Sequence, residues 1–239
     1  MSHSEVNAIE EAFREAKLLN ASLGVRLQHV SDHIRRLKPD MSDAVDTFVA
    51  RLLAAGVGDS APNVGETMPD FMLPDQDGQF VNLETLREKA PVVLVFHRGH
   101  WCPYCRLAMA GFAEIQYSIN PFKLVGISPE RQQYSRIIRS ESEADFPFLT
   151  DVGSGYTLSL NLAIWVDDAM AAMIGHSGAD IPNYAGTNGW FLPIPAVFVI
   201  GQDGRVIARH IDADYRRRME LEDVIAVLDS IRSDVSNQS

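Results

Sequence analysis

Residues 92–105 read VVLVFHRGHWCPYC, an apolar run followed by two closely spaced cysteines. The run Val92–Phe96 has the length and composition of a buried β-strand. Pro103 suits the first position of a helix, because its fixed φ matches helical geometry and its missing N–H would lack a partner there. We therefore expect a central strand, a short turn, and a helix that begins with Cys102 as its N-cap.

Cys102 and Cys105 are the only cysteines in the 239-residue chain, and they form a Cys-Pro-Tyr-Cys motif. The unpaired N–H groups and the positive dipole end of a first helical turn favour a thiolate over a thiol. The dipole contributes about 0.3–1 kcal/mol, whereas lowering a thiol pKa by about two units requires roughly 2.7 kcal/mol. A second positive group is therefore expected, and the candidates nearby in the sequence are Arg98, His97, His100 and Arg106. The corner between strand and helix favours Arg98.

The helix that begins at Pro103 is expected to run to about Ile119 with one apolar face. Cys105 falls on that face and should point toward the core, so Cys102 should point toward the mouth of the site. Arg106 is expected as a solvated charge on the helix surface. Two sulfurs in one helical turn can join reversibly, which makes the pair a candidate redox couple.

Two other interpretations of the cysteine pair stay open. Inert buried packing would not require two sulfurs at this spacing. A structural zinc site needs four ligands, and with no second cysteine pair in the sequence, His100, His176 or another group would have to join. We therefore expect no metal and no cofactor.

From residue 66 onward, strand-like runs alternate with helical ones, a pattern typical of an α/β fold in which helices flank a sheet. Besides Val92–Phe96, the expected strands are 71–73, 80–83, 123–127, 148–149 and a hairpin of 196–200 with 205–210. The expected helical segments are 103–119, 129–139, 155–162 and 219–231. Residues 164–191 are rich in Met, Gly and aromatic residues without clear periodicity, and they are expected either to cover the active site or to pack beside the domain.

The N-terminal part of the chain has helical periodicity. Apolar side chains recur every three or four residues over 6–37, on one long helix or on two broken near Gly24, and Pro39 should end that stripe. A second helical segment covers 42–55, and a Gly- and Pro-rich linker follows at 56–65. We expect a helical hairpin over 1–62 and an α/β domain over 63–239. The hairpin either packs on its own core or serves as a dimerisation arm, so a homodimer through these helices is one prediction.

The composition excludes several classes of function. Lys and Arg number 21 against 32 Asp and Glu, a net charge of −11, which would repel nucleic-acid phosphates. The longest apolar runs fall far short of the roughly 20 residues of a membrane-spanning helix. The acidic N-terminus lacks the features of a secretory leader, so we expect a cytoplasmic protein with neither nucleic acid nor membrane as partner.

Several blocks occur together in a recognisable order. They are Pro69-Asp70-Phe71 with LPDQDG at 73–78, the stretch 92–105, FPFLTD at 146–151, PAVFVI at 195–200 and DADY at 212–215. With these blocks, residues 64–231 resemble the peroxiredoxins of the alkyl hydroperoxide reductase / thiol-specific antioxidant family, most closely a peroxiredoxin-like branch with a Cys-x-x-Cys motif. The resemblance implies a thioredoxin-like fold, in which Pro195 matches the proline that is cis in thioredoxins and faces the cysteine pair.

The chain also departs from that family. The family's peroxide-reducing cysteine ends a Pro-x-x-x-Thr-x-x-Cys motif and aligns with Cys105, so the threonine falls on Cys102 and the proline on Arg98. The arginine that assists peroxide cleavage in the family would fall at Pro195. These assisting groups are therefore missing from their expected places. By thioredoxin precedent, the attacking thiol would instead be Cys102.

The resemblance implies a thiol-dependent antioxidant peroxidase. Cys105 would attack the hydroperoxide, Cys102 would resolve the product, and a thioredoxin-like protein would reduce the disulfide. The residues expected to shape the pocket are Arg98, Trp101, Pro103, Tyr104 and Pro195. The alternatives are a protein thiol–disulfide oxidoreductase with Cys102 as nucleophile, and a non-catalytic protein that interacts through its N-terminal helices. No role is expected for His176 or His210.

Overall fold

The structure, a computed structural model, describes residues 3–237. A five-stranded mixed sheet forms its centre, in the order β5-β4-β3-β8-β9. Strands β3 (Val92–Phe96), β4 (Lys123–Ser128) and β5 (Phe148–Thr150) are parallel. Strands β8 (Ala196–Ile200) and β9 (Val206–Ile211) extend the sheet on the other side of β3 by antiparallel pairing. The expected α/β architecture, a central mixed sheet flanked by helices, is confirmed.

Strand β3 lies in the middle of the sheet and is buried on both faces. Because successive side chains of a strand point to opposite sides, Val93 and Val95 pack in one hydrophobic cluster and Val92, Leu94 and Phe96 pack in another. A strand with no solvent-facing side needs an unbroken apolar run. This is why the expectation for Val92–Phe96 matches the structure residue by residue.

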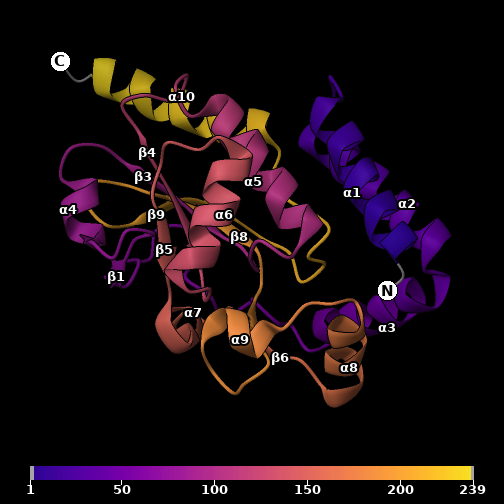
Figure 1. Cartoon of the computed structure of the whole chain (residues 1–239). Coiled ribbons are helices and arrows are strands. Elements are labelled where there is room, and N and C mark those ends of the chain that lie inside the picture. The colour runs from indigo at the N-terminus through magenta and orange to yellow at the C-terminus, as the bar shows by residue number, and fades with distance from the viewer. Residues whose placement is uncertain (1–2, 238–239) are drawn as a thin grey trace.

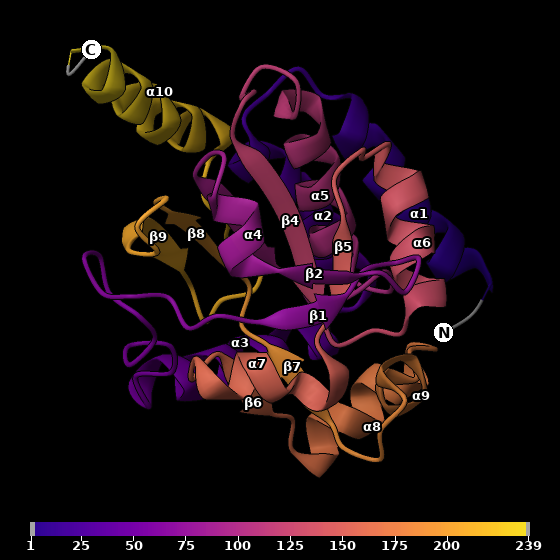
Figure 2. The ribbon, with the colours of Figure 1, turned by 90° about the vertical axis from the view of Figure 1, so that its left-hand side faces the viewer.

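Helices and a small ribbon cover the two faces of the sheet. One face carries α5 (Pro103–Ile115), α6 (Gln132–Ser142) and α10 (Leu221–Asn237) (Figure 1). On the other face lie the antiparallel strands β1 (Met72–Pro74) and β2 (Phe80–Asn82) with α4 (Leu83–Arg87) and α7 (Gly155–Ser159). In Figure 2, β1, β2 and α4 stand in front of the central sheet and α5 stands behind it.

Some element boundaries differ from the expected ones. Helix α5 ends at Ile115 instead of about residue 119, and α6 begins three residues later than expected. The sequence does not predict α4, because residues 80–83 have the pattern of a strand and no helical period follows them. That strand ends at Asn82, whose side chain accepts a hydrogen bond from the backbone N–H of Thr85 and so caps the helix.

The N-terminal part forms three helices in the described residues, which matches the expected alternative of a stripe broken near Gly24 followed by a further helix. Helix α1 (His3–Leu18) and α2 (Leu23–Leu37) are separated before Gly24, and α3 (Pro39–Ala54) begins at the proline that had been expected only to end a helix. A proline at the first helical position begins the next helix as readily as it ends the previous one.

The apolar stripe of α1 and α2 is covered by the same chain. Phe13, Leu23, Leu27 and Val30 are at most 4% exposed, and they share a core cluster with side chains of α5. Packing on the chain's own core is therefore what this stripe does. No apolar side chain of this stripe that the structure describes is exposed, so the stripe does not supply a face for a dimerisation arm, and the homodimer stays a prediction.

The segment 164–191 forms short strands and helices, although its sequence shows no clear periodicity. Strands β6 (Ala163–Trp165) and β7 (Phe191–Pro193) pair with each other, and between them lie α8 (Asp168–His176) and α9 (Ile181–Ala185). Helix α8 packs against α3, and Met170 and Ile174 join Phe48 in a third apolar cluster. Strands of three residues and a helix of five are too short for periodicity to reveal them.

Throughout the described chain, no helix combines the length and hydropathy that crossing a membrane requires.

Candidate active site

The cysteine pair lies where β3 leads into α5. Cys102 is the N-cap of α5 with extended backbone angles, and Pro103 occupies the first helical position. The backbone N–H of Cys105 donates to the carbonyl of Cys102 over 3.0 Å, which closes the first turn. Both cysteines are free thiols, with exposed fractions of 1% for Cys102 and 0% for Cys105.

The sulfur of Cys105 accepts hydrogen bonds from a backbone N–H and from an arginine side chain. The backbone N–H of Arg98 lies 3.3 Å from Sγ, and Nη2 of Arg218 lies 3.5 Å from it. Burial by itself would raise the pKa of Cys105, but a hydrogen bond from the Cys102 thiol, the charges of Arg218 and Arg98, and the Arg98 N–H lower it to about 5. Cys105 is therefore the thiolate of the pair near neutral pH.

Arg218 is the functional residue that the sequence analysis missed. It follows β9 in the segment 212–218. Its Nη1 donates to the backbone carbonyls of Tyr215 and Arg217, while its Nη2 donates to the sulfur of Cys105. The resemblance places the family's assisting arginine at position 195, where this chain has proline. The guanidinium that contacts the Cys105 sulfur belongs to Arg218, in another part of the chain. The run Arg216–Arg217–Arg218, three basic residues in acidic surroundings, was the available signal.

Cys102 faces a cavity of about 200 Å³ between α5, the N-terminal helices and α8. Its wall is mainly apolar, with Ile34, Phe48, Met170 and Ile174 among the lining residues, and Cys105 does not line it. Burial, followed by the neighbouring Cys105 sulfur, raises the pKa of Cys102 well above its usual value. Cys102 thus stays protonated and donates to the Cys105 thiolate.

Arg98 forms part of the cavity wall, as its predicted role requires. Its guanidinium lies over the rings of Tyr215 and Trp101, with 4.0 Å and 4.9 Å from Cζ to the ring centroids. Its buried Nε has no hydrogen-bond partner, and no carboxylate pairs with it among the residues that the structure describes. A desolvated guanidinium held by ring faces keeps its full charge available to a reacting oxygen.

The other predicted pocket residues fall into two groups. Trp101, Pro103 and Tyr104 line the cavity beside Cys102. Pro195 is buried and does not line it, although pairing of Phe96 with Ala196 places Pro195 at the same end of the sheet as the cysteine turn. The expectation of a cis bond before Pro195 is wrong, since among residues 3–237 only the Asn120–Pro121 peptide is cis.

The two histidines of the turn have different surroundings. His97 is fully buried without a hydrogen-bond partner on either ring nitrogen, and burial followed by the charge of Arg218 lowers its pKa to about 3. His100 instead places Nδ1 2.7 Å from the buried Glu130 carboxylate, which also accepts from the His100 backbone N–H.

Gly99 has φ +133°, and a Cβ there would meet Glu130 at 2.3 Å, so the turn requires glycine.

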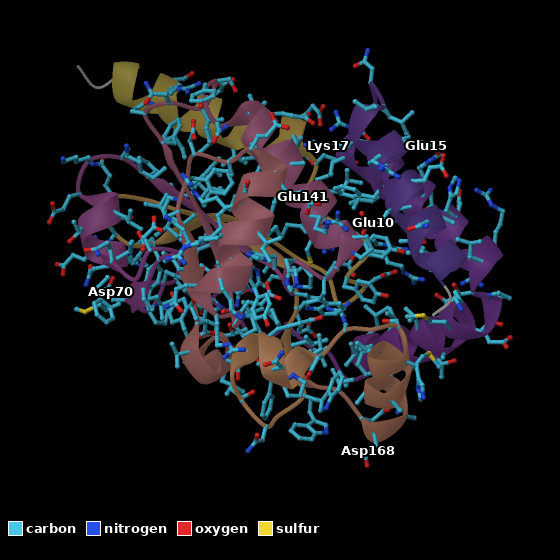
Figure 3. All side chains as sticks on the ribbon, in the orientation of Figure 1. Glu10, Glu15, Lys17, Asp70, Glu141 and Asp168 are labelled. Carbon is cyan, nitrogen blue, oxygen red and sulfur yellow. The ribbon has the colours of Figure 1, made fainter. Side chains whose placement is uncertain are left out.

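Arg106 is not the solvated surface charge that the sequence predicted. Its side chain is only 11% exposed and forms paired hydrogen bonds with Glu10 of α1 and Glu141 of α6. Figure 3 labels both glutamates, on either side of the space between α1 and α6. Arg106 therefore ties the N-terminal helices to the helix that carries the cysteines.

Neither His176 nor His210 lines the cavity.

Comparison with known proteins identifies the family and the fold. The model of the AhpC/TSA family matches residues 64–209. No curated protein matches the chain significantly. Among solved structures, peroxidoxin BcpB from Mycobacterium tuberculosis is 21% identical over 71% of this chain and 98% of its own, with a TM-score of 0.55.

Two further solved structures have the same fold. A yeast mitochondrial 1-Cys peroxiredoxin is 15% identical over 73% of this chain and 78% of its own, with a TM-score of 0.54. A reduced 2-Cys peroxiredoxin from Plasmodium vivax is 14% identical over 72% of this chain and 98% of its own, also at 0.54. At these identities the likeness establishes the thioredoxin-like fold alone.

Proposed function

The chain belongs to the AhpC/TSA family, and on that premise we propose that it is a thiol-dependent peroxidase in which Cys105 attacks a hydroperoxide. The observation that carries the proposal is the convergence of the Arg98 N–H and the Arg218 guanidinium on the sulfur of Cys105. These donors stabilise a thiolate, which is the nucleophilic form of cysteine.

The reaction proceeds in three balanced steps. The Cys105 thiolate attacks the terminal oxygen of the hydroperoxide, the O–O bond breaks, and the alkoxide leaves as an alcohol once protonated, with sulfenic acid left on Cys105. The Cys102 thiol then displaces the sulfenic hydroxyl as water and forms the Cys102–Cys105 disulfide. A dithiol donor reduces that disulfide and becomes a disulfide itself.

The residues around the sulfurs support these steps. The charge that develops on the leaving oxygen would be stabilised by Arg98, which lines the cavity and has no competing carboxylate partner among the described residues. Both sulfurs belong to the first turn of α5, three residues apart, a spacing that would allow them to join as a disulfide. We assign the reduction to a thioredoxin-like protein, which would reach the disulfide through the Cys102 side of the cavity.

A protein thiol–disulfide oxidoreductase is the second candidate function. It is favoured by one observation: Cys102 lines the cavity and Cys105 does not. In that reaction Cys102 would attack the disulfide of a partner and Cys105 would resolve the mixed disulfide. The raised pKa of Cys102 opposes this assignment, since a protonated thiol is a poor nucleophile.

The two cysteine variants distinguish these functions. C102S and C105S are treated with stoichiometric hydroperoxide, and sulfenic acid is trapped with a dimedone-type reagent and located by mass spectrometry. The peroxidase predicts rapid adduct formation on Cys105 in C102S, with C105S reacting no faster than a free thiol. If neither variant exceeds a free thiol while the unaltered protein reduces insulin disulfides, the oxidoreductase is correct. Absence of both activities would exclude both proposals.

A further inference from the structure

A group of potential metal ligands lies on the outer side of α1 and α2, apart from the cysteine pair. Glu15 comes from α1, and His29 and His33 lie one turn apart on α2. One ligand atom from each residue lies within 4.8 Å of the other two. Figure 3 labels Glu15 on the side of these helices that faces away from the sheet.

One hydrogen bond joins the His29 ring to the Glu15 carboxylate, and a second one holds the His33 ring. Nδ1 of His33 lies 3.0 Å from the carbonyl oxygen of His29. Because a carbonyl oxygen only accepts, Nδ1 carries the proton, and Nε2 of the neutral ring keeps its lone pair. Metal-bound histidines are commonly held in one tautomer by such a bond from the other ring nitrogen.

The distances suit coordination of one ion. The Glu15 Oε2 atom lies 3.0 Å from Nε2 of His29 and 4.0 Å from Nε2 of His33. With Zn–N and Zn–O bonds of about 2.0–2.2 Å, ligand atoms of a tetrahedral ion are separated by roughly 3.3–3.6 Å, a value between the two distances. Histidines at i and i+4 of a helix face the same side, which is also the spacing used by the histidines of zinc-binding helices.

We propose that Glu15, His29 and His33 form a binding site for a divalent ion of the zinc class. Two imidazoles and a carboxylate suit Zn²⁺ or Cu²⁺ better than Mg²⁺ or Ca²⁺, which prefer all-oxygen sites. The imidazole side chains are 29% and 30% exposed and Glu15 is 53% exposed, so solvent can complete the coordination. The sequence analysis expected no metal, and the His-x-x-x-His spacing in a helical segment was the signal for this one.

Binding would connect two helices that border the cavity. Helix α1 contributes Ile9 and Glu10 to the cavity wall, and α2 contributes Ser31 and Ile34. An ion held by Glu15 on α1 and by two histidines on α2 would restrict movement of one helix along the other. The site is therefore structural, and it involves neither sulfur.

The test is titration of a cysteine-free protein with ZnCl₂. The C102S/C105S variant serves as parent, because its remaining side chains include no thiolate that could bind Zn²⁺. Isothermal titration calorimetry should show one equivalent bound, and H29N and H33N in this parent should each lose that binding. H176N, which removes an exposed histidine on α8, is the matched control and should bind like the parent. Binding by H33N equal to that of the parent, or no Zn²⁺ binding by the parent, would overturn the proposal.

A spectroscopic measurement keeps the test valid if a histidine variant fails to fold. The parent is loaded with one equivalent of Cu²⁺, and nitrogen couplings are counted by electron paramagnetic resonance. Two coordinated imidazole nitrogens support the site. A spectrum with one or no imidazole nitrogen, or unchanged binding after the E15Q substitution, contradicts it.

Discussion

Nη2 of Arg218 lies 3.5 Å from the sulfur of Cys105, although 113 residues separate the two in the sequence. The guanidinium reaches the sulfur from the segment that follows β9, while Arg98 approaches it from the end of β3. Two arginines from distant parts of the chain thus contact one sulfur, Arg98 through its backbone N–H and Arg218 through its guanidinium. The properties of this thiolate depend on tertiary contacts that can be removed one at a time.

Replacing Arg218 with Met should raise the pKa of Cys105 by about one unit or more, because a positive charge in contact with the thiolate is lost. The ultraviolet absorbance of the thiolate, followed against pH, measures the shift. R217M is the matched control, since the Arg217 side chain is 73% exposed and forms its ion pairs with Asp212 and Asp214. An equal pKa in R218M and R217M would show that Arg218 does not stabilise the thiolate.

The pH profile of the unaltered protein should follow ionisation of Cys105. Because the pKa of this thiol is lowered to about 5, the reactive form is present above that pH and disappears below it. The rate constant for hydroperoxide consumption by the reduced protein should stay nearly level from about pH 8 to about pH 6. It should fall to about half near pH 5 and approach a tenfold fall per unit below about pH 4. An inflection near the free-thiol value of about 8.5 would contradict the assignment.

His97 should make the protein less stable in mild acid. Burial keeps its ring neutral, with a pKa lowered to about 3, whereas the unfolded chain takes up a proton near pH 6.5. The unfolded state therefore binds more protons between these values, and the free energy of unfolding falls as the pH decreases through that window. The slope from this one group is at most about 1.4 kcal/mol per pH unit.

Urea unfolding of H97L at several pH values tests this effect. Both ring nitrogens of His97 lack a hydrogen-bond partner, so an apolar replacement of similar size leaves no donor unsatisfied and should preserve stability at pH 7. The loss of stability between pH 7 and pH 5 should be smaller in H97L than in the unaltered protein. Identical pH dependence of the two proteins would exclude the role of His97.

Arg106 should contribute to the stability of the N-terminal helices. R106M leaves Glu10 and Glu141 without their shared partner and should lower the free energy of unfolding by about 1–2 kcal/mol, a range reduced because both carboxylates are partly exposed. Chemical denaturation measures this value, and amide exchange should increase in α1. R51M is the control, because Arg51 is 61% exposed and its pair with Asp167 lies on the surface. Equal losses in R106M and R51M would show that burial gives Arg106 no special role.

Local patterns in the sequence predicted a large part of the fold. The apolar run Val92–Phe96 indicated a doubly buried strand, and the alternation of elements from residue 66 indicated a sheet flanked by helices. Both signals are local, since burial on each face determines which residue types a strand accepts. The short elements β6, α9 and β7 gave no such signal, because three to five residues do not establish a period.

The chain's amino-acid order alone placed Cys102 and Cys105 on the first turn of a helix after a central strand. Pro103 and the preceding apolar run act on their immediate neighbours, so no distant contact is needed to establish that geometry. Tertiary structure alone decided which sulfur is the thiolate. The charge of Arg218, the contact of Arg106 with α1 and α6, and the cavity that reaches Cys102 arise when distant segments pack together. Electrostatic stabilisation depends on distance in space, which sequence separation does not reveal.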